Sequence, residues 1–227
     1  GDHMEQVTLG PQDRSEVLRY LGYRGQELPA ELTDQVDYCM DQVNRAADPR
    51  CLMKIFSRKD RDDYPPELAF LTGEDIRRHL DGCEEIICLA ATLGSGIDSL
   101  LRKMQIRDMA DALIMDSCAS TLIEAVCDSL DAELRAQYQK RGKYLTFRFS
   151  PGYGDLPIGI NSQFAALMES RRIGLTVSAS GIMIPRKSVT AMIGVSRQPR
   201  EKKQKACAAC NLNGSCRFRM NGVTCGQ

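Results

Sequence analysis

The segment Arg148–Pro157 combines the residue types best suited to hold a small ligand. A Pro-Gly pair near its centre fits a type II turn, because Pro fixes φ for the second position and Gly tolerates the positive φ of the third. Gly152 and Gly154 carry no Cβ, so we expect a ligand to be able to approach the backbone at both. Arg148 offers planar donors to a carboxylate, and Tyr153 offers a face to a flat heterocycle. The combination suits a zwitterionic ligand with an aromatic end, such as S-adenosylmethionine, although Pro-Gly turns and surface arginines are also common without one.

A second candidate site is a cluster of cysteines in the last part of the chain. Its spacing is Cys-x2-Cys-x5-Cys-x8-Cys, formed by Cys207, Cys210, Cys216 and Cys225. Without a secretory signal, clustered cysteines favour a metal over a disulfide framework. Four thiolates fit tetrahedral Zn2+ or one [4Fe–4S] cluster, and the uneven spacing with a single Cys-x-x-Cys favours the cluster. Zinc, and unligated thiols or disulfides, are the alternatives.

The rest of the composition excludes several classes of partner. Formal net charge is zero, from 30 basic and 30 acidic residues, so no global field favours nucleic acid or an anionic membrane. No apolar run approaches the roughly 20 residues that span a bilayer, and no signal-peptide core is evident. We therefore expect a cytoplasmic protein. Six other cysteines are spread through the body of the chain: Cys39, Cys51, Cys83, Cys88, Cys118 and Cys127. Most of them lie among apolar neighbours and are expected to be small buried side chains.

The elements that must position the first site alternate between helices and strands. The pattern predicts an α+β fold, with a mostly antiparallel twisted sheet flanked by helices. The longest helix is expected to place Ile106 and Leu113 on one packed stripe. Expected helices are 30–47, 74–80, 106–138 and 160–172, with another after the loop at 92–96. Expected strands are 51–56, 85–92, 144–149, 174–180 and 189–196, the last two forming a pair joined by a turn through Pro185.

The chain is expected to divide into three parts. Residues 1–10 are an extension that begins with a cloning remnant. Residues 11–198 form the folded domain. Residues 199–227 are a basic linker followed by the four-cysteine tail, and the linker is either solvated and flexible or meets an acidic partner surface.

Several motifs together resemble a known family. Arg148-x-x-x-Gly152-Tyr153, followed by Pro157, resembles the S-adenosylmethionine-binding signature of the activation domain of cobalamin-dependent methionine synthase. Further runs resemble the same family in the same order, and the resemblance covers residues 11–198. These runs are Leu122–Ala125, Ile173–Thr176, and Pro185–Val189 leading to Ile193–Val195.

The resemblance implies a domain that presents the methyl group of S-adenosylmethionine to cobalamin held by the synthase. An electron donor such as flavodoxin or ferredoxin reduces cob(II)alamin, and methyl transfer traps the cob(I)alamin. By this analogy Arg148 holds the ligand carboxylate, and the backbone around Ser150 and Gly152 lines the adenosine or methionine portion. Tyr153 sits near the reacting end or frames the pocket. Glu124 is an acid facing the site from the long helix, or else a solvated helix carboxylate.

Departures from the family restrict this expectation. The cobalamin-binding hallmark Asp-x-His-x-x-Gly is absent, because Arg77 stands where its acid belongs and His79 is then expected to be an ordinary helix residue. The chain should therefore act in trans, on a separate synthase that lacks its own activation domain. The family also uses an acidic residue near its N-terminus for the ligand's amino group, and Asp34, Asp37 and Asp41 cannot be told apart as candidates.

Two hypotheses from different classes follow. The first is a reductive-activation partner that donates a methyl group to partner-bound cobalamin. The second is a non-catalytic S-adenosylmethionine-binding regulator or adaptor with a metal-pinned tail. A conventional small-molecule methyltransferase is less favoured, because no Rossmann-type glycine fingerprint is present. A [4Fe–4S] cluster would suit the first hypothesis, since the reaction needs a low-potential electron, or would only pin the tail.

Overall fold

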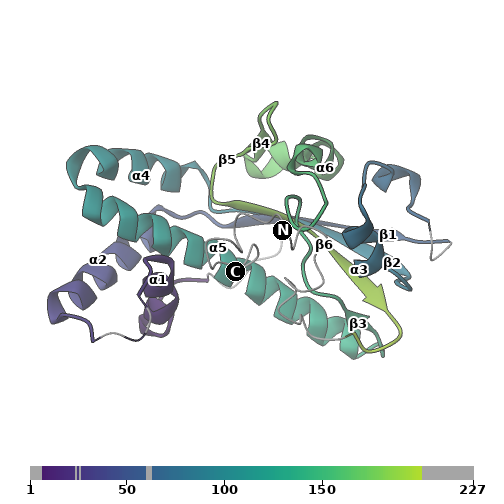
Figure 1. Ribbon diagram of the computed structural model, residues 1–227, viewed down its shortest axis with the longest axis horizontal. Helices are drawn as coiled ribbons and strands as arrows, with labels where there is room; N and C mark the ends of the chain where they lie inside the picture. Colours follow the sequence, from purple (N-terminus) through teal and green to yellow (C-terminus); the bar gives the residue numbers. More distant parts are fainter. Residues whose placement is uncertain (1–6, 24, 26, 60–62, 201–227) are drawn as a thin grey trace.

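The computed structural model describes residues 7–23, 25, 27–59 and 63–200. At their centre is a four-stranded antiparallel sheet in the order β1-β2-β6-β3. The long helix α5 (Met109–Gln139) covers one face, and α6 (Asn161–Met168) with the small β4–β5 sheet covers the other (Figure 1). The predicted α+β class is confirmed. The strands are β1 Arg50–Ser57, β2 Glu85–Thr92, β3 Tyr144–Leu145, β4 Thr176–Val177, β5 Met183–Ile184 and β6 Ser188–Ser196.

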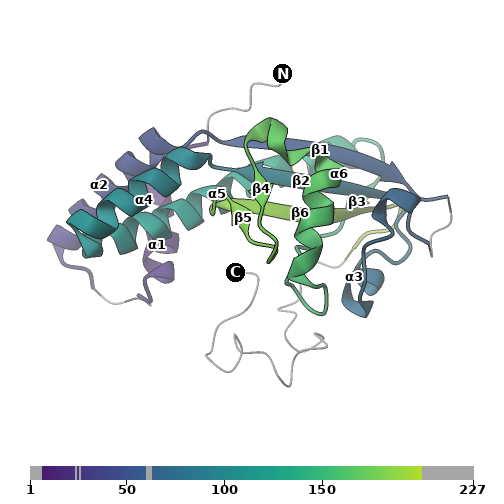
Figure 2. The ribbon, with the colours of Figure 1, turned by 90° about the horizontal axis from the view of Figure 1, so that it is seen from above.

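The helices divide between a bundle at one end and single helices on the sheet. In the bundle, α1, α2 and α4 pack with the first half of α5 (Figure 2). Short 3-10 turns connect several elements: η1 Pro11–Asp13, η2 Pro66–Leu68, η3 Ile158–Ile160 and η4 Ser170–Ile173. The α-helices are α1 Arg14–Tyr20, α2 Ala30–Ala46, α3 Glu74–His79, α4 Ser95–Arg107, α5 Met109–Gln139 and α6 Asn161–Met168.

The central strands β2 and β6 are buried on both faces. Ile87 pairs with Ile193, and both pack in the cluster that contains Leu134 of α5. The next pair, Cys88 with Met192, packs in the cluster that contains α6. Because both faces are covered, these strands are apolar at nearly every position rather than at alternate ones.

The cysteines of the folded part mostly behave as predicted. Cys51 is half-buried, while the other five are buried: Cys39, Cys83, Cys88, Cys118 and Cys127. Burial raises the pKa of the Cys88 and Cys118 thiols to about 12, so both stay protonated at neutral pH. Their role is therefore packing, not thiolate chemistry.

The predicted helix over 106–138 begins later than expected. Asp108 leaves the helical conformation, and its carboxylate accepts hydrogen bonds from the backbone of Ala110 (3.0 Å) and Asp111 (3.1 Å). This N-cap separates α4 from α5. The predicted packed stripe is wrong, because Ile106 is 88% and Leu113 59% exposed.

Two other predictions at the C-terminal end of the domain are wrong. The strand expected over 174–180 pairs with β5 rather than with β6, forming a separate two-stranded sheet. The helix expected over 160–172 ends at Met168, because Glu169 adopts a left-handed conformation (φ 54°) and the chain continues as η4. Among the described residues, no helix is both long and apolar enough to cross a membrane.

Candidate functional site

The turn predicted within Arg148–Pro157 is present. The backbone of Tyr153 donates to the carbonyl of Ser150 at 3.0 Å, and Gly152 has φ 91°, as the third position of a type II turn requires. The backbone of Gly152 also donates to the carbonyl of Leu156 at 2.8 Å, which closes the loop. Gly152 is exposed, and a Cβ placed there would meet Ile158 at 3.8 Å, an ordinary contact distance.

Helix α3 anchors the far side of this loop. The Asp155 carboxylate accepts hydrogen bonds from the backbone of Glu74 (2.8 Å) and Asp75 (3.0 Å), at the start of α3. The Asp75 carboxylate in turn accepts from the backbone of Asp155 at 3.1 Å, a reciprocal arrangement like a capping box. Gly154 is buried in this junction with φ 55°, and a Cβ would collide with Asp75. The prediction that a ligand approaches the backbone at Gly154 is therefore wrong.

The segment that leads into the turn contains a β-bulge. Leu145 pairs with Val195, and Phe149 bridges to Met192. Four residue steps along the 145–149 segment therefore lie opposite three residue steps along β6. Leu145 and Val195 pack on the α5 side of the sheet, whereas Phe149 and Met192 pack on the α6 side. An uninterrupted strand would keep residues 145 and 149 on the same face, so one extra residue has been inserted.

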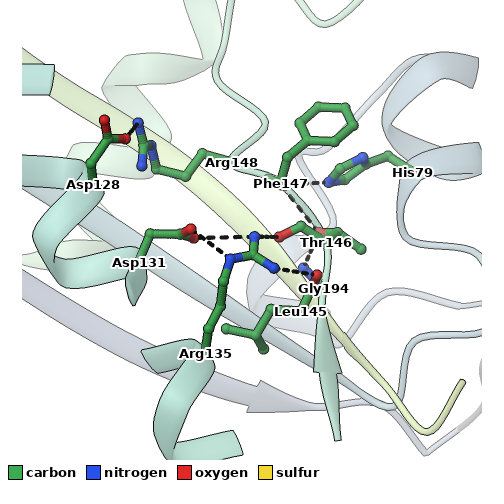
Figure 3. A network of polar contacts seen from close by, with 9 residues as sticks. All are labelled: His79, Asp128, Asp131, Arg135, Leu145, Thr146, Phe147, Arg148 and Gly194. Atoms are coloured by element: carbon green, nitrogen blue, oxygen red, sulfur yellow. Dashed lines mark hydrogen bonds and ion pairs between the residues drawn. The ribbon is translucent and has the colours of Figure 1, made fainter. Parts of the chain in front are cut away.

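This bulge determines which face of the sheet the Arg148 side chain lies on. In regular alternation from Leu145, residue 148 would face the α6 side of the sheet. The extra residue instead turns Arg148 toward α5, where its guanidinium meets Glu124 and Asp128. Figure 3 shows Arg148 and Asp128 facing each other. The prediction of a continuous strand over 144–149 is therefore wrong, and the interruption is what places the cation.

Arg135 of α5 supports the bulged segment. Its guanidinium donates to the carbonyls of Leu145 (2.9 Å) and Thr146 (2.7 Å), and its orientation is fixed by Asp131 at 2.6 Å (Figure 3). The Thr146 hydroxyl accepts from the backbone of Gly194 at 2.8 Å. Side-chain donors and acceptors thus replace the ladder bonds that the bulge interrupts.

His79 supports the next carbonyl from the opposite face. Its Nε2 lies 2.9 Å from the carbonyl oxygen of Phe147, and its ring packs against those of Phe147 (4.4 Å) and Phe149 (5.0 Å between centroids). A carbonyl only accepts, so Nε2 carries the hydrogen. Burial lowers the pKa of His79 to about 4, and the hydrogen bond to Phe147 offsets this only in part. The positive charge of Arg200 lowers this pKa further, so His79 is a neutral residue that fixes the bulge.

Arg148 is mostly buried and doubly paired. Its Nη2 lies 2.8 Å from an oxygen of Asp128 and 3.1 Å from one of Glu124, while only 17% of its side chain is exposed. Burial opposes the charge, but the hydrogen bond to Asp128 and the nearby negative charges outweigh it and raise the pKa of Arg148 above its usual value. Arg148, Glu124 and Asp128 together carry a net charge of −1. A further positively charged group would therefore be attracted to this cluster.

Tyr153 packs on the α6 side of the sheet, with its ring partly in the core. The ring meets Phe149 edge-to-face at 4.9 Å and Phe147 at 6.4 Å between centroids. It is half-buried and belongs to the cluster packed beneath the turn. Edge-to-face packing fixes the orientation of the ring, so it can frame a bound ligand without reordering.

The structure brings most of the predicted site residues together. Ser150, Gly152 and Tyr153 lie on one turn, which Arg148 precedes by two residues. Glu124 contacts Arg148 from α5, whereas the Tyr153 ring packs on the α6 side. Sequence reasoning missed Asp128 altogether. Its position four residues after Glu124, on the same face of the long helix, was the available signal.

The acidic candidates near the N-terminus lie elsewhere. Asp37 forms a two-point pair with Arg14, with both distances 2.6 Å, and Asp41 pairs with Arg45 at 2.9 Å. Like Asp34, they lie on α2. None of the contacts recorded for Arg148 in the described part involves them.

The predicted metal ligands Cys207, Cys210, Cys216 and Cys225 lie outside the described residues. Within residues 7–23, 25, 27–59 and 63–200, no group of three or more His, Cys, Asp or Glu side chains could hold a metal ion. A cavity of about 430 Å³ lies between α6, η4 and β4, and none of the predicted site residues lines it.

Comparison with known proteins identifies the fold. No protein-family model and no curated protein matches the chain. Among solved structures, the chain is similar to the crystal structure of the MetH reactivation domain bound to AdoHcy (S-adenosylhomocysteine). Sequence identity is 14%, the similarity covers 96% of this chain and 85% of that one, and the TM-score is 0.59. The chain therefore has the fold of that domain, as the sequence resemblance implies.

Proposed function

We propose that this chain binds S-adenosylmethionine and acts in trans to remethylate cob(II)alamin on a separate cobalamin-dependent methionine synthase that lacks its own activation domain. The observation that carries the proposal is the Arg148 signature, set on a type II turn and aimed by a bulge, within the fold of the MetH reactivation domain. That relative was crystallised with AdoHcy, the product that remains when S-adenosylmethionine has given up its methyl group.

Each residue of the turn has a role in this proposal. The guanidinium of Arg148 binds the ligand's carboxylate, because it is already charged and oriented in a partly desolvated position. The backbone of Ser150 and of the exposed Gly152 lines the ligand, and Tyr153 frames it with a ring held by Phe149. The protein then contributes binding and orientation, holding the sulfonium methyl group where the partner's cobalt can reach it.

The reaction itself uses groups that the partners bring. One electron from a donor such as flavodoxin or ferredoxin reduces cob(II)alamin to cob(I)alamin. The cob(I)alamin attacks the sulfonium methyl carbon, so a cobalt–carbon bond forms and the carbon–sulfur bond breaks. The products are methylcobalamin and AdoHcy, and the sulfonium charge is lost as the bonding pair passes to sulfur.

The cysteine tail belongs to this proposal as an independent element. Four thiolates from Cys207, Cys210, Cys216 and Cys225 would hold a [4Fe–4S] cluster, with Zn2+ as the alternative. A cluster would supply a low-potential electron or pin the tail, and either role leaves the Arg148 site as described.

A reconstituted remethylation assay tests the function. A synthase without an activation domain is loaded with cob(II)alamin and mixed with this chain, S-adenosylmethionine and a reductant, and methylcobalamin is followed by its absorbance. We expect methylcobalamin and AdoHcy to form in a one-to-one ratio with the wild type. The same yield is expected with Arg45→Ala, a control on α2 whose wild-type side chain is 74% exposed. We expect little product with Arg148→Ala. Binding of S-adenosylmethionine without remethylation of any such synthase would favour the regulatory or adaptor function.

A further inference from the structure

Strand β1 forms a long, regular edge of the central sheet. It pairs with β2 on one side only, and Figure 2 shows it along the outer side of the sheet. Its register with β2 runs without a bulge through all eight residues, Arg50–Ser57. The opposite edge ends in the two-residue strand β3 and the bulge that Arg135 supports. Long regular edges are the ones that pair with another chain, whereas short or bulged edges are protected from it.

The backbone of alternate β1 residues points away from the sheet. The N–H of Arg58, just after β1, donates to the carbonyl of Glu84 at 2.8 Å in the same register. Even-numbered residues therefore bond toward β2, and odd-numbered residues point outward. Within the described part of the chain, no hydrogen bond is recorded for the outward N–H and C=O groups of Met53, Ile55 and Ser57. A further strand can pair with these groups.

Two exposed apolar side chains accompany this open edge. Met53 is 44% and Ile55 is 53% exposed. They lie opposite Leu89 and Ile87 of β2, which places them on the face of the sheet that α5 covers farther in. A strand added to β1 would remove both side chains from water, which favours pairing.

The one lysine of β1 does not protect the edge. Natural edge strands are often blocked by a lysine or by an inward-pointing charge. Lys54 instead lies on the α6 face, where its ammonium donates to the carbonyl of Leu167 at 2.8 Å and pairs with Glu169 at 3.0 Å. Its charge is compensated within the chain, so β1 remains able to pair.

The sequence of β1 is complementary to itself in one antiparallel register. A two-fold axis at Met53 places this residue opposite its own copy and Ile55 opposite Cys51 of the other copy. These outward-pointing residues would exchange backbone hydrogen bonds, and their side chains would form one apolar group on the α5 face. Just outside each end of the ladder, Asp48 of one copy lies opposite Arg58 of the other, a pair of opposite charges.

The two neighbouring registers are worse. An axis at Lys54 places this residue opposite its own copy, and like charges directly opposite each other destabilise a sheet. An axis at Leu52 places Pro49 opposite Ile55, in a position that needs an N–H which proline lacks. The axis at Met53 avoids both faults.

We propose that two copies of this chain pair along β1, antiparallel and centred on Met53, so that their sheets become one continuous sheet. The apolar match at the centre and the opposite charges at the ends favour a second copy over an unrelated strand. The turn that contains Gly152 follows β3 at the other edge of each sheet, so the dimer leaves both turns open to a partner.

Sedimentation equilibrium of the full chain tests the association, with a thiol reductant present to prevent disulfides. We expect a reversible dimer of the wild type. Met53→Lys places two ammonium groups opposite each other at the centre of the ladder, and it should raise the dissociation constant by at least about tenfold. Ile106→Lys, at an isoleucine that is 88% exposed on α4, is the matched control and should leave the constant unchanged.

A disulfide cross-link tests the register. Residues in a hydrogen-bonded antiparallel pair have Cα atoms about 5.5 Å apart, within the range that a disulfide spans. Mild oxidation of Met53→Cys should therefore join two chains through position 53, which mass spectrometry of the proteolytic peptides identifies. Ser57→Cys, on the same edge, should not link to its own copy, because position 57 lies at opposite ends of the ladder in the two chains.

Three results would count against the dimer. A wild type that stays monomeric at every concentration overturns the proposal, and so does a dimer that withstands Met53→Lys. A dimer that Met53→Lys dissociates, but that forms no link through position 53, overturns the proposed register. Binding of a synthase strand to monomeric chain, lost in Met53→Lys, would assign the edge to that partner instead of to a second copy.

Discussion

The partly buried histidine beneath the bulge makes the stability of this fold depend on pH. His79 has a pKa of about 4 in the folded chain, against an ordinary value of 6.5. Below pH 6.5 the unfolded chain binds a proton that the folded chain does not, so protons favour unfolding. The contribution of neutral His79 is therefore fully present above pH 6.5 and is lost progressively as the pH falls toward 4.

The size of the effect follows from these two values. Lowering the pH from 7 to 5 should reduce the free energy of unfolding by about 2 kcal/mol through His79 alone. For a domain of this size the loss corresponds to a fall in melting temperature of roughly 4–8 °C. Carboxylates also titrate toward acid pH, and several have lowered pKa values through their ion pairs, among them Glu84 and Glu169. A variant that changes only His79 is needed to separate them.

His79→Gln is that variant, because its amide can still donate to the Phe147 carbonyl but does not titrate. The chain has only two histidines, so the comparison isolates one group. Urea unfolding of both proteins at pH 7, 6 and 5 should show the wild type losing about 2 kcal/mol more than the variant between the extremes. Parallel losses in the two proteins would refute the argument that His79 is buried and neutral.

Three further predictions concern the turn, the bulge and the tail. Gly154→Ala should destabilise the fold by about 1–3 kcal/mol more than Gly142→Ala in urea unfolding, because both glycines have positive φ but only a Cβ at Gly154 meets Asp75. Equal losses would exclude the packing of the turn on α3. Arg135→Met should lower the unfolding free energy by about 2 kcal/mol and weaken binding of S-adenosylmethionine. Arg45→Met, at an exposed ion pair, should do neither. Normal binding with Arg135→Met would show that the hydrogen bonds from Arg135 to the two carbonyls do not orient Arg148. Anaerobically purified full-length chain should be brown and contain iron, and the colour should be lost in Cys207→Ser. Colourless protein with one equivalent of zinc would contradict the cluster.

Much of the fold could be predicted because its signals are local. The type II turn follows from the Pro-Gly pair at Gly152, and α2 follows from its apolar spacing. The two-stranded sheet of β4 and β5 could not be predicted, because strands of two residues have no periodicity. The predicted stripe was wrong at Ile106, because Ile106 belongs to α4 and the Asp108 cap begins a new helix, α5, after it.

The candidate site was predicted in part for a related reason. Arg148 was predicted from its residue type beside the Pro-Gly turn and Glu124 from the motif resemblance, but their direct contact depends on a bulge that has no signal in the sequence. Tyr144–Phe149 alternates as a regular strand would, and the register is set instead by side chains from other elements, Arg135 and His79. Bulges fixed by tertiary contacts have no local signature.

The most direct test of the account is a calorimetric titration of S-adenosylmethionine into the wild type and Arg148→Ala. We predict saturable binding to the wild type, and a loss of about 1.5–3 kcal/mol in the variant, which is roughly ten- to 150-fold in affinity. Affinity unchanged by Arg148→Ala would show that the turn does not hold the ligand's carboxylate, and would contradict the central claim.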